Sequence, residues 1–150
     1  MATRFTKKNE ISRNWLVVDA KDQIVGRVAS AVSMFLMGKH KPTYSPNLDT
    51  GDYVIVLNVE QLKFTGNKLD QKIYHRHTGF VGGIKSTTAR AMMAKKPEEV
   101  LRKAVKGMLP KSNLSLRRMM KLKIYKGDKH PHAVQQPKAV KINASGKVSA

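Results

Sequence analysis

The sequence predicts an α/β domain built on a parallel sheet. Two apolar runs carry this prediction, at residues 15–20 and 53–58, and each is too continuously apolar to have a solvated face. Strands buried on both faces have this composition, and the β-branched second run favours a central place in the sheet. Between the two runs, apolar residues at helical spacing predict a helix over about 26–37, which Gly38 would end. A strand, a helix and a second buried strand indicate a βαβ unit with a right-handed crossover.

The middle of the chain is predicted to alternate loops with shorter elements. Residues 39–51 are predicted to be loop and contain the turn-forming Asp49-Thr50-Gly51. Residues 62–65 favour a short edge strand, and residues 72–78 can form another strand. Three glycines follow between 79 and 83, so the next loop can bring its backbone close to another surface.

The following segment is predicted to be mostly helical. Ser86 is a suitable N-cap for a helix over 87–96, and Pro97 suits the first turn of the helix after it. That second helix carries an apolar stripe at helical spacing. A short helix over about 113–120 and a last strand at 122–124 complete the predicted elements.

The length of 150 residues suits one domain, and a hydrophobic content of 41% is too high for a disordered chain. We expect a basic N-terminal arm over 1–14, a single α/β domain over 15–137 and a basic, flexible tail over 138–150. The chain has no cysteine, so disulfides and thiolate metal sites are excluded, which fits a reducing compartment.

The charge of the chain is large and uneven. The formal net charge is +19, whereas a magnitude of about 2–8 serves the solubility of a small domain. Residues 1–70 hold ten Lys or Arg against seven Asp or Glu, and residues 71–150 hold nineteen against three. This excess indicates a polyanionic partner. A nucleic acid fits better than an anionic membrane, because no apolar run approaches the roughly 20 residues that span a bilayer and the N-terminus lacks the apolar core of a signal peptide.

The sequence offers little support for catalysis or metal binding. The glycines at 79–83 lack the pattern of a P-loop or a dinucleotide-binding loop, and no serine lies in a nucleophile elbow. His75-Arg76-His77 and His130-Pro131-His132 have a spacing that suits two metal ligands, but so strong a positive charge repels a dication. Contact with phosphate or a base, or ordinary packing, suits these histidines better.

Basic residues gather in clusters that Gly/Pro loops separate and aromatic residues interleave. The clusters lie at 39–41, 72–85, 103–111 and 117–129. Such clusters neutralise phosphates and release counterions without reading a base sequence. Tyr74, His75, Arg76 and Phe80 could stack on unpaired bases, which is how irregular RNA is held. No helix-turn-helix, zinc-finger or RRM-type pattern is present, so recognition would rest on RNA shape read by several loops.

Several motifs follow one another along the chain. The first are Trp-Leu-Val-Val-Asp-Ala from 15, Val-Gly-Arg-Val-Ala-Ser from 25, Gly-Lys-His-Lys-Pro-Thr-Tyr from 38 and Asp-Thr-Gly-Asp-Tyr-Val-Ile-Val from 49. The later ones are Tyr-His-Arg-His-Thr-Gly-Phe from 74 with Gly82-Gly83, Lys-Gly-Met-Leu-Pro-Lys from 106, and His-Pro-His from 130 with Gln-Gln-Pro from 135. In order and spacing the set resembles the bacterial-type family of large-subunit ribosomal protein L-thirteen, over roughly residues 12–137.

This resemblance implies a three-layer α/β/α fold with a small, mainly parallel four-stranded sheet. It also implies a structural constituent of the large ribosomal subunit, in the cytoplasm or in an organelle, that supports early subunit assembly and translation. The implied partners are large-subunit rRNA and neighbouring ribosomal proteins, with no enzymatic activity, cofactor, metal, membrane or small-molecule substrate. The resemblance and the basic clusters together indicate these rRNA-binding residues: Lys39, His40, Lys41, Tyr74, His75, Arg76, His77, Lys85, Lys103, Lys106, Lys111, Arg117, Arg118, Lys121, Lys123, His130 and His132.

The chain departs from the family pattern at residues 114–118. Leu-Ser-Leu-Arg-Arg stands there in place of the usual Leu-Gly-Arg. The lost glycine leaves the local backbone conformation open, and the double arginine keeps charge available, so we expect altered contacts with retained binding. On the residues alone, two other functions stay open: a free-standing nucleic-acid binder and a nucleotide-using α/β enzyme.

Overall fold

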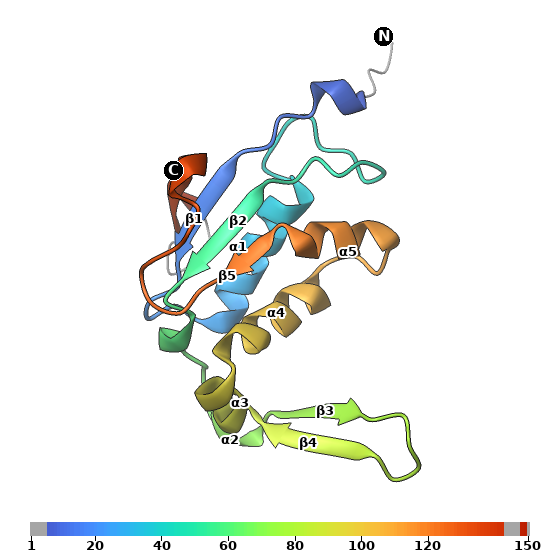
Figure 1. Cartoon of the computed structure of the whole chain (residues 1–150), viewed down its shortest axis with the longest axis vertical. Coiled ribbons are helices and arrows are strands. Elements are labelled where there is room, and N and C mark those ends of the chain that lie inside the picture. The colour runs from blue at the N-terminus through green and yellow to red at the C-terminus, as the bar shows by residue number, and fades with distance from the viewer. Residues whose placement is uncertain (1–5, 143–147, 150) are drawn as a thin grey trace.

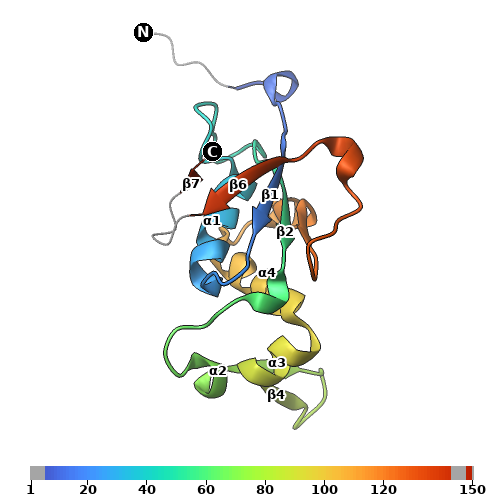
Figure 2. The ribbon, with the colours of Figure 1, turned by 90° about the vertical axis from the view of Figure 1, so that its left-hand side faces the viewer.

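A parallel sheet lies at the centre of the structure, a computed structural model that describes residues 6–142 and 148–149. Its parallel strands follow the order β5-β2-β1-β6, and the short β7 pairs antiparallel with β6 at the edge (Figures 1 and 2). The strands are β1 (Trp15–Asp19), β2 (Tyr53–Leu57), β5 (Leu122–Ile124), β6 (Lys138–Ile142) and β7 (Val148–Ser149). The two continuous apolar runs form the central pair, with Val17 opposite Ile55. The predicted α/β class with a mainly parallel, four-stranded sheet is confirmed.

Helices cover one face of the sheet. They are α1 (Val25–Met37), α4 (Pro97–Met108) and α5 (Asn113–Met120). α1 and α4 pack against each other behind the sheet, and α5 contacts α1 (Figures 1 and 2). The apolar stripes of α1 and α4 are buried, as at Val32 of α1 and Leu101 of α4. The helix α1 ends at Gly38, whose φ of 82° lies in the left-handed region. Within the described part of the chain, none of the helices combines the length and apolarity of a membrane span.

A loop covers the opposite face of the sheet. Residues 125–137 cross this face and include the 3-10 turn η3 (Ala133–Gln135) (Figure 2). Trp15 of β1 stacks on Tyr53 of β2 with ring centroids 4.4 Å apart, and His132 packs on Trp15 at 5.0 Å. The third layer therefore consists of a loop and a single short turn held by aromatic contacts.

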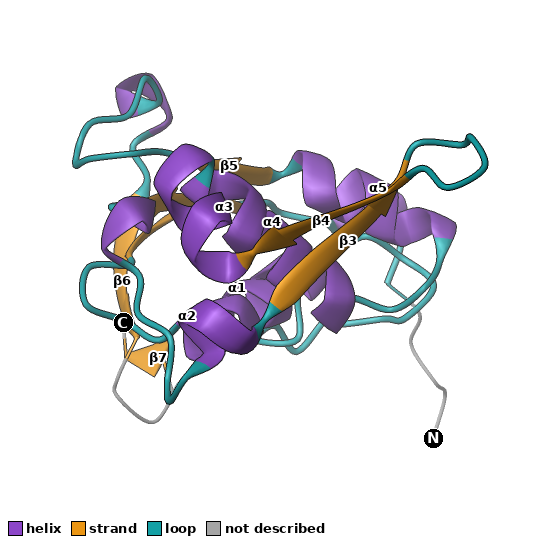
Figure 3. Cartoon of the chain, turned by 90° about the horizontal axis from the view of Figure 1, so that it is seen from below, coloured by secondary structure: helices purple, strands orange, loops and turns teal. Residues whose placement is uncertain are grey.

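The chain between β2 and α4 leaves the sheet and forms a separate hairpin. Its elements are η2 (Val59–Gln61), α2 (Lys68–Gln71), β3 (Ile73–His77), β4 (Ile84–Thr88) and α3 (Ala89–Lys95). β3 and β4 pair antiparallel, and their tip projects beyond the helices (Figures 1 and 3). The predicted helix start at Ser86 is wrong, because Gly79 and Gly82, with φ of 94° and 69°, turn the chain back into a strand. Thr88 caps α3 instead, its Oγ1 accepting the Ala91 N–H at 3.3 Å.

The domain extends further toward the C-terminus than the sequence predicts. Residues 138–142, assigned to the tail, form β6, whose Val140 and Ile142 are 9% and 6% exposed. The boundary at 137 is therefore too early, because apolar residues alternating with lysines form a strand with one buried face. Residues 143–147 and 150 of the predicted tail and 1–5 of the predicted arm lie outside the described residues. Within the arm, η1 (Lys8–Glu10) is a 3-10 turn.

Gly51 closes the loop after α1 against the end of that helix. A Cβ at this position would lie 1.9 Å from the Leu36 carbonyl oxygen and 2.4 Å from the carbonyl carbon. Gly51→Ala is therefore expected to lower the free energy of unfolding by about 1–3 kcal/mol, because backbone would have to move. Gly107→Ala in α4, where a Cβ meets nothing within 4 Å, is the control and should raise it by about 0.5–1 kcal/mol. Urea titration measures both changes, and equal stabilities of Gly51→Ala and the native chain would contradict the close approach.

Candidate nucleic-acid interface

In the loop after α1, two basic side chains, His40 and Lys41, contact the buried carboxylate of Asp52. Asp52 is 1% exposed, and its Oδ2 lies 2.8 Å from His40 Nε2. Lys41 Nζ donates to the other Asp52 oxygen and, at 2.7 Å, to the Ser12 carbonyl. These contacts hold the loop against the N-terminal lead-in and leave Lys39 exposed to solvent.

A second pair of basic residues lies inside the protein. Lys121 Nζ donates to Asp49 Oδ1 at 2.6 Å and to the Gly51 carbonyl at 2.9 Å. Arg118 is 2% exposed, donates from Nη2 to the Leu48 carbonyl at 3.3 Å, and places its Nε 3.8 Å from Asp49 Oδ1. Burial lowers the pKa of Lys121, and Asp49 opposes that shift. Arg118 and Lys121 are therefore removed from the predicted RNA-binding set, because their head groups face the loop and not the solvent.

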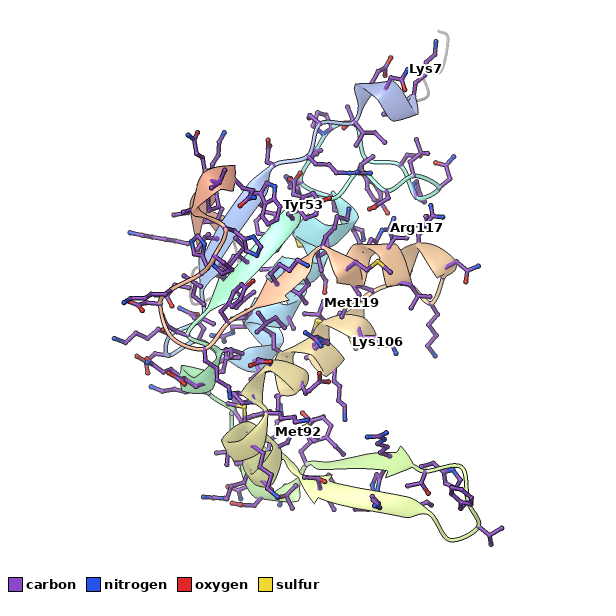
Figure 4. The ribbon with its side chains drawn as sticks, in the orientation of Figure 1. Lys7, Tyr53, Met92, Lys106, Arg117 and Met119 are labelled. Carbon is purple, nitrogen blue, oxygen red and sulfur yellow. The ribbon has the colours of Figure 1, made fainter. Side chains whose placement is uncertain are left out.

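α5 carries the segment that departs from the motif pattern. Residues 114–118 continue as regular helix, so the lost glycine leaves the backbone helical. Ser115 Oγ donates to the Pro110 carbonyl and ties α5 to the preceding turn. Arg117 lies on the exposed side of the helix (Figure 4), whereas Arg118 points inward. The double arginine thus divides into one exposed side chain and one structural side chain.

Tyr74 anchors the base of the hairpin. The ring is half-buried, and the ammonium groups of Lys72 and Lys103 lie over it at 5.3 and 5.0 Å from its centroid. Burial raises the pKa of the Tyr74 hydroxyl. The ring therefore stays neutral near pH 7 and offers a polarised face beside two cations.

The strands of the hairpin place two positive charges side by side. Arg76 of β3 lies directly opposite Lys85 of β4, and both are exposed. Like charges in a cross-strand pair destabilise a sheet, so this arrangement favours a bound anion. His75 Nδ1 lies 2.8 Å from Ser86 Oγ, and His77 Nδ1 accepts the Gly79 N–H at 3.0 Å where the chain turns.

The histidines at 130 and 132 lie on the other side of the sheet. His132 Nε2 lies 2.8 Å from the Tyr125 hydroxyl, and the His132 N–H donates to His130 Nδ1 at 3.2 Å. Both residues are half-buried, and the His132 ring lies between Trp15, at 5.0 Å, and the His130 ring, at 6.4 Å. No group of three or more His, Asp or Glu side chains suited to a metal occurs among the described residues. The contacts indicate that this pair organises the third layer.

A family model described as Ribosomal protein L13 matches residues 13–131 of the chain. The chain belongs to this family. Two relatives named "Large ribosomal subunit protein uL13" are each 53% identical to it. The one from Nitrosomonas eutropha aligns over 96% of this chain and 100% of its own length, and the one from Trichlorobacter lovleyi over 91% and 96%. A third with this name, from Chloroflexus aurantiacus, is 53% identical over 92% of this chain and 96% of its own. The resemblance inferred from the motifs is confirmed.

The remaining candidates in this ribosomal protein L13 family member differ in exposure. Exposed are Lys39, His40, His75, Arg76, His77, Lys85, Lys103, Lys106, Lys111 and Arg117, and half-buried are Lys41, Tyr74, Lys123, His130 and His132. The loop after α1, α5 and the hairpin extend to one side of the molecule, where Figure 4 labels Lys106 and Arg117. The fold gathers four more lysines around the base of the hairpin: Lys68, Lys72, Lys95 and Lys96. The predicted basic cluster at 72–85 includes Lys72, and sequence reasoning did not select the other three.

Proposed function

We propose that this member of the ribosomal protein L13 family is a structural constituent of the large ribosomal subunit. In this role it binds large-subunit rRNA, contacts neighbouring ribosomal proteins and supports early subunit assembly, in ribosomes of the cytoplasm or, alternatively, of an organelle. The role is architectural and involves no catalysis, cofactor, membrane or small-molecule substrate.

The observation that carries this proposal is a set of exposed basic side chains that form no ion pair within the described part of this well-packed domain. Arg76 and Lys85 face each other across the hairpin, and three more exposed cations lie on α4, in the turn after it and on α5: Lys106, Lys111 and Arg117. Among the described residues, none of these five forms an ion pair with a carboxylate. Cations held apart from acids on rigid elements match the spaced phosphates of folded RNA.

Sedimentation tests the proposal. The tagged protein is expected to travel with large subunits through sucrose gradients at high salt, because many phosphate contacts act together. Sedimentation only at the top of the gradient would overturn the ribosomal role and favour a free-standing nucleic-acid binder.

Arg117→Ala provides the residue-level measurement. Binding to an rRNA fragment should weaken, and the slope of log K against log salt should fall by about one, because one phosphate contact is lost. Melting temperature should stay unchanged, since Arg117 is exposed. Asp70→Ala, at an exposed carboxylate on α2, is a control that should leave the salt slope unaltered. An unchanged slope for Arg117→Ala would contradict the RNA contact of α5.

A further inference from the structure

Two neighbouring pockets lie at the base of the hairpin. The inner pocket has a volume of about 340 Å³ and lies between the start of α1, residues 63–72 and α4. The outer pocket has a volume of about 640 Å³ and lies between the hairpin, α3 and α4. Tyr74 and Lys103 line both pockets, so the two form one continuous depression with the Tyr74 ring between its halves.

The inner pocket combines an apolar floor with a cationic rim. Phe64 and Met108 contribute the apolar surface, and Lys68 and Lys72 contribute ammonium groups beside the shared Lys103. Lys63, on the same rim, is paired with Asp22 at 2.6 Å. An apolar surface bordered by cations suits a flat ring that carries a phosphate.

The outer pocket continues the positive charge. Arg76 and Lys85 come from the hairpin, and Lys95 and Lys96 come from the end of α3, near the position of Met92 in Figure 4. Glu99 is the acid in this lining, and its carboxylate is engaged by Arg102 at 3.1 Å. The depression therefore holds cations on both sides of Tyr74 with little internal neutralisation.

We infer that this depression binds an unpaired stretch of RNA, with one base seated in the inner pocket against the Tyr74 ring and the next phosphates in the outer pocket. The inference rests on the proposed function and specifies the form of RNA that this part of the protein takes. The ammonium groups of Lys72 and Lys103, now over the Tyr74 ring, turn aside to pair with phosphate, and a base takes their place on the ring.

The shape and chemistry of the depression favour unpaired RNA over two other occupants. A duplex keeps its base faces inside the stack, so it can use the cations but not the apolar floor. A free mononucleotide fills one pocket and leaves the cations of the other without a partner. An unpaired strand uses the ring, the floor and both groups of lysines together.

Tyr74→Leu tests the role of the ring. Fluorescence anisotropy with a short labelled oligoadenylate should show binding roughly tenfold weaker, whereas binding of a blunt RNA duplex of equal length should stay the same. Tyr74→Phe, which keeps the ring, is the matched control and should bind both probes as the native chain does. Equal losses for both probes, or no loss for oligoadenylate, would overturn the inference, as would AMP competing as strongly as the oligonucleotide.

If Tyr74→Leu changes the structure of the hairpin, a double lysine variant tests RNA binding in the depression instead. Lys72→Gln with Lys103→Gln should lower the salt slope for oligoadenylate by about 1.4, because two contacts to a single strand are lost. Lys138→Gln with Lys141→Gln removes the same charge from β6 and should leave the slope unchanged. Equal salt slopes for oligoadenylate binding by the two double variants would contradict the inference. Failure of the native chain to sediment with large subunits would instead overturn the proposed function, so the two failures are distinguishable.

Discussion

Replacing Val56 with aspartate is expected to unfold the domain. Val56 is fully buried in β2, where its neighbours across the sheet are Val18 of β1 and Ile124 of β5. A carboxylate there has no partner in the apolar core, and its desolvation costs several kcal/mol. Domains of this kind have a total stability of only about 5–15 kcal/mol, so most of it would be lost. Far-UV circular dichroism and thermal melting measure the effect.

Two comparisons make this result specific to the buried position. Val134→Asp makes the same chemical change at a side chain that is 88% exposed, and it should melt like the native chain. The loss at position 56 should also be smaller near pH 4 than near pH 7. Burial raises the pKa of the introduced carboxyl group above its unfolded value, so the stability difference from the native chain grows as pH rises. Native-like melting of Val56→Asp would contradict the central place of β2.

The elements that the sequence predicts well are those whose apolar pattern is local. β1 and β2 are continuous apolar runs, and α1 and α4 carry stripes at helical spacing, so each pattern indicates both the element and its buried face. β6 escaped prediction because its lysines give the segment the composition of a tail. Its register depends on pairing with β1, which precedes it by more than 100 residues in the chain. A strand whose partner is that distant leaves only a weak local pattern.

Sequence-based prediction of the candidate interface is also limited by contacts between residues that are distant in the chain. Basic composition correctly marks the hairpin, α4 and α5 as positively charged, but it does not distinguish exposed cations from buried ones. Arg117 and Arg118 are adjacent and chemically identical, yet only the second faces the loop after α1. The carboxylate that accompanies Lys121 comes from Asp49, 72 residues away. A buried cation is therefore predictable only when the fold shows which acid lies beside it.

Asp49→Ala is expected to have the second large effect on stability, because Asp49 belongs to a buried cluster with Arg118 and Lys121. Asp49 is the carboxylate beside both Lys121 and Arg118, at 2.6 and 3.8 Å. Its removal leaves two buried cations without a counterion, and breaking a buried pair in this way costs about 3 kcal/mol. Asp70→Ala is the matched control, because it breaks the Arg90 ion pair, at 2.7 Å, on the surface. An exposed pair contributes about 0–1 kcal/mol, so the control should change the urea midpoint little.

Replacing Arg118 and Lys121 as well as Asp49 distinguishes two causes of the lost stability: two buried cations without a counterion, or a disrupted loop. Asp49→Ala combined with Arg118→Met and Lys121→Met should be more stable than Asp49→Ala alone, because apolar side chains of similar length then fill the space without a charge to desolvate. The loop would still lose the hydrogen bonds from Lys121 to the Gly51 carbonyl and from Arg118 to the Leu48 carbonyl, so recovery should be partial. Equal urea midpoints for the single and triple variants would show that the loss comes from the loop itself. Partial recovery would assign the loss to the two uncompensated cations, and would establish that Asp49 stabilises the fold by neutralising Lys121 and Arg118 inside the protein.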